Sequence, residues 1–206
     1  MLVKGEEKLT KYLFHGSHAS GIETLHATSK LHGMEDTMVV YLTANPTYAL
    51  FYIWDAEHNK RTGKYVTCFI KNGKVYYEEQ FPGMLKAFYK GVSGYLYCIP
   101  HTEEFARVEG WEEMWYSTKD AAIAEVRYIP DVYEELMKYE KEGKLEVISY
   151  EKVTPERIKD LYEYIARKLV NNNIVKKPDC EEAVFYQTYF EPVWKMALER
   201  AETNEE

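Results

Sequence analysis

The chain is 206 residues long, with 46% hydrophobic and 29% charged residues and a formal net charge of −8. That length suits one domain with an appendage, or at most two small domains. A folded chain of this size buries roughly 70% of the surface that the unfolded chain exposes. The acidic excess and the lack of a basic cluster argue against binding to a nucleic-acid backbone, which needs a concentrated basic face.

Neither a membrane segment nor a metal site is expected. Residues 1–10 lack the apolar core of a signal peptide, and no apolar run reaches the ~18 residues of a membrane span, so we expect a cytoplasmic protein. The three cysteines are far apart and form no C-x-x-C pair, which predicts reduced thiols. His15 and His18 have no acidic or cysteine ligands at metal spacing, so we expect no metal.

The first quarter of the chain predicts two strands and two helices. Residues 12–14 are predicted to form a short strand, and residues 21–25 a short helix. The β-branched residues of 38–42 predict a second strand. A helix follows, with Asn45 or a neighbour as its cap and Pro46 in its first turn. Its apolar residues at helical spacing predict a buried inner face, made of Ala49, Leu50, Ile53 and Trp54.

The middle of the chain predicts many short strands with a few helices between them. Asn72-Gly73 is a strong hairpin signal and joins two predicted strands, 64–71 and 74–78. The remaining expected elements are a helix at 84–89, strands at 94–99, 105–108 and 113–117 with a turn at Gly110, a strand at 121–129, a helix at 130–139 and a strand at 144–150. Because strands and helices do not alternate regularly, the pattern favours an α+β fold over residues 1–150.

Residues 154–206 are predicted to form a helical appendage. Thr154-Pro155 is a cap followed by a first-turn proline, and an apolar stripe follows at helical spacing. After a polar linker at 171–178, Asp179-x-x-Glu182 predicts a capping box, and Pro192 should kink or split the last helix. We expect the aromatic residues of this segment to pack on the main domain, with a protein partner as the alternative.

Two segments carry polar residues at strand ends. His15 closes the first strand and is followed by Gly16, which leaves backbone that a ligand can approach. Tyr41 lies on the strand 38–42, and Tyr52 follows it by eleven residues. Taken singly, each segment has a plain structural explanation. His15 could simply hydrogen-bond to backbone at a strand end, and Tyr41 and Tyr52 could simply pack in the core.

Together the segments YLFHGS and VVYLTANPTYALFY resemble the NAD-binding half of the ADP-ribosyltransferase superfamily, in its H-Y-E, poly(ADP-ribose) polymerase-like branch. The match covers about residues 12–130. It implies split mixed or antiparallel sheets with flanking helices. It also implies that His15 binds the adenosine ribose of NAD, that the Gly16 backbone binds the nicotinamide carboxamide, and that Tyr41 and Tyr52 sandwich the nicotinamide ring.

The resemblance further implies a catalytic glutamate and a wider set of NAD contacts. Glu113 is placed like the family glutamate, with Glu112 and Glu125 as alternatives, and would stabilise the positive charge that develops as nicotinamide leaves. Members of the family often carry a serine where this chain has Ala49. The NAD-binding set implied here also includes three residues beside the motifs: Ser17, Thr43 and Tyr48.

The sequence thus predicts a NAD-dependent mono-ADP-ribosyltransferase acting on an unknown acceptor. A non-catalytic module that binds a nucleotide or partner with the same fold is the alternative, and an interaction protein that docks through its helical C-terminus is a third. The related RNA 2′-phosphotransferase chemistry needs arginines near the histidine, and residues 1–50 contain none.

Overall fold

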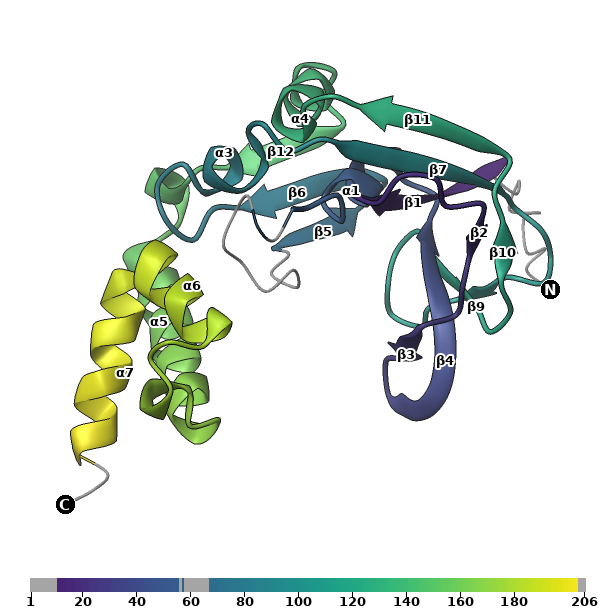
Figure 1. Ribbon diagram of the computed structural model, residues 1–206. Coiled ribbons are helices and arrows are strands. Elements are labelled where there is room, and N and C mark those ends of the chain that lie inside the picture. The colour runs from purple at the N-terminus through teal and green to yellow at the C-terminus, as the bar shows by residue number, and fades with distance from the viewer. Residues whose placement is uncertain (1–10, 56, 58–66, 204–206) are drawn as a thin grey trace, which may run out of the picture.

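The fold is α+β and is built around an antiparallel sheet of seven strands, in the order β11-β7-β1-β4-β9-β8 with β3 paired to β4 (Figure 1). The computed structural model describes residues 11–55, 57 and 67–203. The strands of this sheet are β1 (Tyr12–Ser17), β3 (Ser29–Leu31), β4 (Met34–Thr43), β7 (Gly94–Pro100), β8 (Ala106–Arg107), β9 (Met114–Ser117) and β11 (Glu125–Ile129).

Two smaller sheets flank the main one. In the first, β12 (Leu145–Ile148) runs parallel to β6 (Lys74–Glu78), which pairs antiparallel with β5 (Cys68–Lys71). Asn72 and Gly73 join β5 to β6 with φ angles of 52° and 73°. The tight hairpin turn needs positive φ at both positions, so this prediction is confirmed. In the second, β2 (Thr24–Leu25) pairs with β10 (Ala121–Ala122).

Helix α1 (Pro46–Leu50) packs against the main sheet at β1. The Asn45 side chain accepts hydrogen bonds from the backbone N–H groups of Thr47 and Tyr48, which confirms the predicted cap. The helix ends at Leu50, earlier than predicted. Ala49, Leu50 and Ile53 are buried as predicted, although Ile53 lies beyond the helix end, whereas Trp54 is only partly buried. Helices α3 (Met84–Tyr89) and α4 (Val132–Lys141) follow later in the chain.

Three helices form the C-terminal end: α5 (Pro155–Asn171), α6 (Glu181–Tyr189) and α7 (Glu191–Thr203). Thr154 caps α5 as predicted, and the chain splits into α6 and α7 just before Pro192, also as predicted. The predicted capping box is wrong, because α6 begins one residue later, with Cys180 at its cap position and no side-chain cap bond. Asp179 therefore lies outside the cap.

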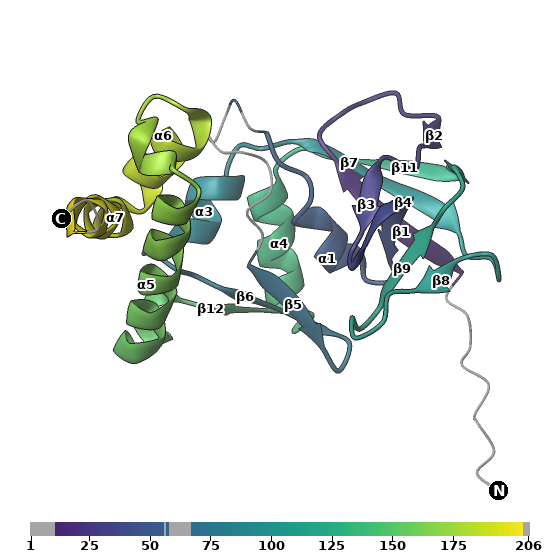
Figure 2. The ribbon, with the colours of Figure 1, turned by 90° about the horizontal axis from the view of Figure 1, so that it is seen from below.

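Aromatic side chains join these helices to the rest of the chain. Phe81 stacks on Tyr189 with ring centroids 5.8 Å apart and meets Phe190 edge-on at 5.2 Å. The Tyr162 hydroxyl donates to the carbonyl of Gln80 at 2.9 Å. Figure 2 shows the three helices at one end of the molecule, away from β3 and β4. A protein partner on the outer surface of these helices stays a prediction.

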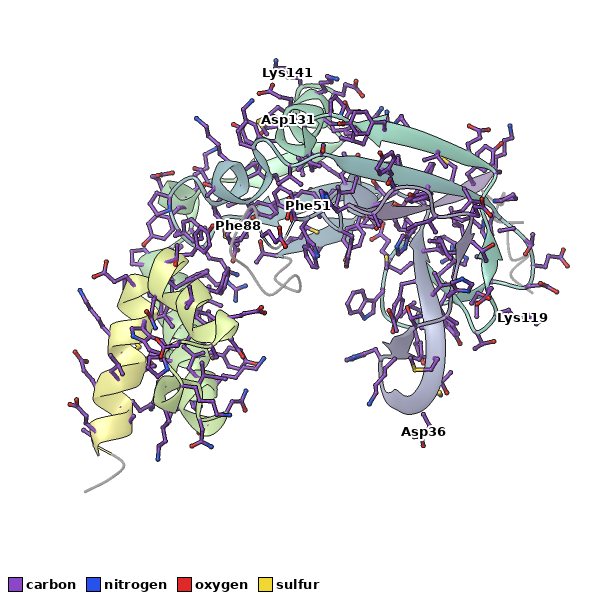
Figure 3. The ribbon with its side chains drawn as sticks, in the orientation of Figure 1. Asp36, Phe51, Phe88, Lys119, Asp131 and Lys141 are labelled. Atoms are coloured by element: carbon purple, nitrogen blue, oxygen red, sulfur yellow. The ribbon has the colours of Figure 1, made fainter. Side chains whose placement is uncertain are left out.

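A second aromatic cluster lies in the core of the part of the chain that precedes these helices. Phe51 stacks on Tyr77 at 5.1 Å and meets Tyr89 edge-on at 5.6 Å. Phe51 and Phe88 lie in the interior in Figure 3, whereas Lys141 lies at the periphery. None of the helices in the described part of the chain is both long and apolar enough to cross a membrane.

Several predicted boundaries are wrong for reasons of pairing. The predicted helix at 21–25 is extended, because Leu25 pairs with Ala121 in the two-stranded sheet. The predicted strand at 121–129 is two strands, β10 and β11, that pair with different partners. The predicted strand at 64–71 begins at Cys68, and residues 64–66 lie outside the described residues.

Candidate functional site

A cavity of about 680 Å³ lies beside β1, β4 and α1, and is closed further by β2, β3 and the loop that precedes β9. Small-molecule sites in proteins span about 300–1,000 Å³, so this cavity has the volume of a ligand site. Most of its lining is apolar or aromatic, with three histidines among the polar groups. Figure 1 shows β4 and β3 extending away from the rest of the sheet.

Six of the seven predicted NAD-binding residues line this cavity: His15, Gly16, Tyr41, Thr43, Tyr48 and Tyr52. The seventh, Ser17, does not, and its hydroxyl accepts a hydrogen bond from the Ala19 N–H at 3.2 Å. The tertiary structure therefore brings the two resembling segments together around one hollow.

His15 lies inside β1 rather than at a strand end, which corrects the prediction. It is paired with Tyr97 in a strand flanked by β7 and β4. Its Nδ1 donates to the Tyr41 carbonyl at 3.1 Å. A carbonyl only accepts, so Nε2 is left as a hydrogen-bond acceptor. Burial lowers the pKa of His15, and the carbonyl contact opposes that shift only in part, so the ring is neutral at pH 7.

The three tyrosines of the cavity are held in fixed positions. The Tyr41 hydroxyl accepts from the His32 N–H at 2.7 Å and donates to the Lys30 carbonyl at 3.1 Å, which ties its ring to the β3–β4 turn. The hydroxyls of Tyr48 and Tyr52 are 3.1 Å apart. Burial raises the pKa of both phenols, that of Tyr52 to about 12, so both stay neutral at physiological pH.

Gly16 is required by packing. A Cβ atom built on Gly16 would lie 2.0 Å from the Ala49 carbonyl oxygen and 3.0 Å from Ile53 Cγ1. The first contact is with helix backbone, which cannot move aside as a side chain can. The glycine therefore allows α1 to approach β1, and this approach places Tyr48 and His15 on the same cavity.

Glu113, the predicted catalytic acid, does not line the cavity. It precedes β9 with a φ of 55°, and its Oε2 accepts a hydrogen bond from Asn45 Nδ2 at 2.9 Å. Its carbonyl accepts from the Ala44 N–H at 3.0 Å and from Thr43 Oγ1 at 2.8 Å. Glu113 thus joins the start of β9 to the end of β4 and the cap of α1.

The two alternative acids also lie elsewhere. Glu112 accepts hydrogen bonds from the N–H groups of Asn72 at 3.0 Å and Gly73 at 2.8 Å, so it binds the β5–β6 turn. Both Glu112 and Glu113 precede β9, whereas the predicted strand at 113–117 included Glu113. Glu125 accepts from the Tyr12 hydroxyl at 2.7 Å and borders a different, smaller hollow.

Other cavity residues were not predicted from the sequence. His26 Nδ1 lies 2.8 Å from Asp120 Oδ2, and His32 lies with its ring centroid 6.2 Å from that of Trp111. His26 and Asp120 are 94 residues apart and meet through the pairing of β2 with β10. No local sequence signal marks such a pair, because the contact exists only once these two short strands are adjacent.

Comparison with known proteins gives no family. No protein-family model matches the chain, and no curated protein or solved structure matches it either. Within the residues that the structure describes, no group of three or more histidine, cysteine and acidic side chains is arranged to hold a metal ion.

Proposed function

We propose that the chain has an ADP-ribosyltransferase-like fold, binds NAD in the cavity and transfers ADP-ribose to an acceptor that is not identified. The supporting observation is that His15, Gly16, Tyr41 and Tyr52, which carry the family resemblance, line one cavity of about 680 Å³. Aromatic side chains can stack on the planar ring of a nucleotide, and a neutral imidazole can hydrogen-bond to a ribose hydroxyl.

Each lining group has a stated role in this proposal. The tyrosine rings would pack on the nicotinamide, a contact worth about 0.5–1.5 kcal/mol beyond area burial. His15 Nε2 would accept a hydrogen bond from a ribose hydroxyl, because Nδ1 is already committed to the Tyr41 carbonyl. Ala49, where the family often has a serine, offers no hydroxyl to the carboxamide, so the amide would depend on backbone groups.

The second candidate is a module that binds a nucleotide without turning it over. It is favoured by the positions of Glu112, Glu113 and Glu125, since none of them lines the cavity. A transition state with positive charge on the ribose gains several kcal/mol from a nearby carboxylate, and its absence slows the reaction by orders of magnitude. The two candidates share the binding step and differ in turnover.

The deciding experiment measures NAD binding by calorimetry and nicotinamide release by chromatography on the same preparation. Tyr52→Ala should weaken NAD binding by about tenfold, the loss expected for one aromatic contact. Tyr128→Ala is the matched control, because Tyr128 is an exposed tyrosine of β11 that does not line the cavity. Binding with nicotinamide release supports the transferase, and binding alone supports the module. Absence of NAD binding would refute the transferase and would show that NAD is not the ligand of the module.

A further inference from the structure

An imidazole–carboxylate pair lies at the cavity and is not explained by the family resemblance. His26 lines the cavity, and its Nδ1 lies 2.8 Å from Asp120 Oδ2. Asp120 is itself fixed, because its Oδ1 accepts a hydrogen bond from the Ala27 N–H at 3.2 Å. The hydrogen bond from His26 is also the largest cause of a lowered pKa at Asp120, so this carboxylate is ionised at neutral pH.

The geometry sets the chemistry of His26. An ionised carboxylate only accepts hydrogen bonds, so Nδ1 must carry the proton that it donates to Asp120. In the neutral ring Nε2 then has a free lone pair. If Nε2 takes a proton, Asp120 stabilises the imidazolium that results. An oriented histidine with a carboxylate behind it is the usual arrangement for a general base.

We propose that His26 is the general base of the transfer reaction and that Asp120 is its positioning residue. This inference rests on the proposed transferase function and assigns an acceptor class, a hydroxyl group or water. In the step, the bond between ribose C1′ and the nicotinamide nitrogen breaks, and its electron pair leaves with nicotinamide. The acceptor oxygen forms the new bond to C1′, and its proton moves to His26 Nε2 and then to solvent.

A second histidine shows why position matters. His18 also has an acidic neighbour, with Nε2 3.9 Å from an Asp55 oxygen, and its Nδ1 donates to the Ser93 carbonyl at 2.8 Å. It does not line the cavity. His18 and His26 are both exposed, so replacing either should cost little stability. His18→Gln is therefore a matched control for His26→Ala.

The test compares turnover and binding in these variants. His26→Ala should lower kcat for nicotinamide release by about 100-fold, the lower range for loss of a general base, while the NAD dissociation constant changes less than twofold. Added imidazole should raise the rate of nicotinamide release by His26→Ala at least tenfold. A purely structural role of His26 would not allow this rescue. Asp120→Asn should also lower kcat, because an amide nitrogen facing Nδ1 favours the wrong tautomer. His18→Gln should leave both constants unchanged.

Three results would overturn the inference, and each is distinguishable. If wild-type protein releases nicotinamide and His26→Ala does so at the same rate, His26 is not the base and the proposed function stands. If the ¹⁵N spectrum of the wild-type protein shows His26 protonated at Nε2 instead of Nδ1, Asp120 does not position it, whatever the protein does with NAD. If calorimetry detects no NAD binding, the proposed function fails, and the general-base role of His26 fails with it because there is no transfer reaction.

Discussion

Replacing Gly16 with alanine should displace α1 from β1 and damage both stability and binding. The new Cβ would lie 2.0 Å from the Ala49 carbonyl oxygen, whereas ordinary contacts begin at 3.4 Å. Helix backbone must therefore move by more than an ångström, or β1 must bend within a sheet that pairs it on both sides. Overpacking of a core typically costs about 1–3 kcal/mol, and a clash with backbone belongs at the upper end, so we expect about 3 kcal/mol.

Urea unfolding at pH 7 measures this loss, and calorimetry with NAD measures its effect on the cavity. Gly110→Ala is the control, because Gly110 has a φ of 76° but nothing within 4 Å of an added Cβ. Its cost is backbone strain alone, about 1–2 kcal/mol. A Gly16→Ala variant that is no less stable than Gly110→Ala would show that α1 does not press on β1 as described.

Three further predictions follow from the contacts of single residues. Glu113→Gln should lower stability by about 1 kcal/mol, because it weakens a charge-assisted bond from Asn45, yet leave NAD affinity unchanged; a large loss of affinity would mean that Glu113 reaches the cavity. Unfolded Tyr52 ionises near its ordinary pKa of 10.0, but the folded phenol only at about 12. Stability should therefore fall as pH rises through this interval, and Tyr52→Phe should flatten that slope in urea midpoints. Phe190→Ala should cost about 3–5 kcal/mol in urea unfolding, because its fully buried ring meets Phe81; a loss below about 1 kcal/mol would refute that packing.

Local chemistry determined much of the fold from the sequence. Asn72-Gly73 specifies a two-residue hairpin because both positions adopt positive φ, and the turn is where the sequence predicts it. Thr154, Asn45 and Pro192 mark helix boundaries correctly, because a cap or a missing N–H acts on the residues beside it. In each case the signal and the structure that it causes are a few residues apart.

The cavity was predictable only in part. Its six predicted lining residues come from two segments of the first 52 residues, one in β1 and the other running from β4 through α1 to Tyr52, and these segments pack together. The acids were not predictable. Glu112 and Glu113 lie in a loop whose side chains bind the β5–β6 turn and the α1 cap, and those partners are distant in sequence. The predicted strand at 113–117 included Glu113, which the structure places in this loop.

Sequence alone determined the α+β class of the fold, the Asn72-Gly73 turn and the caps at Asn45 and Thr154. The family resemblance brought His15 and the tyrosines of the cavity into one predicted site. Tertiary structure decided which carboxylate contacts His26 of the cavity, since Asp120 is 94 residues away and reaches it only through the pairing of β2 with β10. The physical reason is the separation along the chain of the residues that interact. Caps and turns depend on neighbouring residues, whereas a site depends on hydrogen bonds between strands whose adjacency no local pattern encodes.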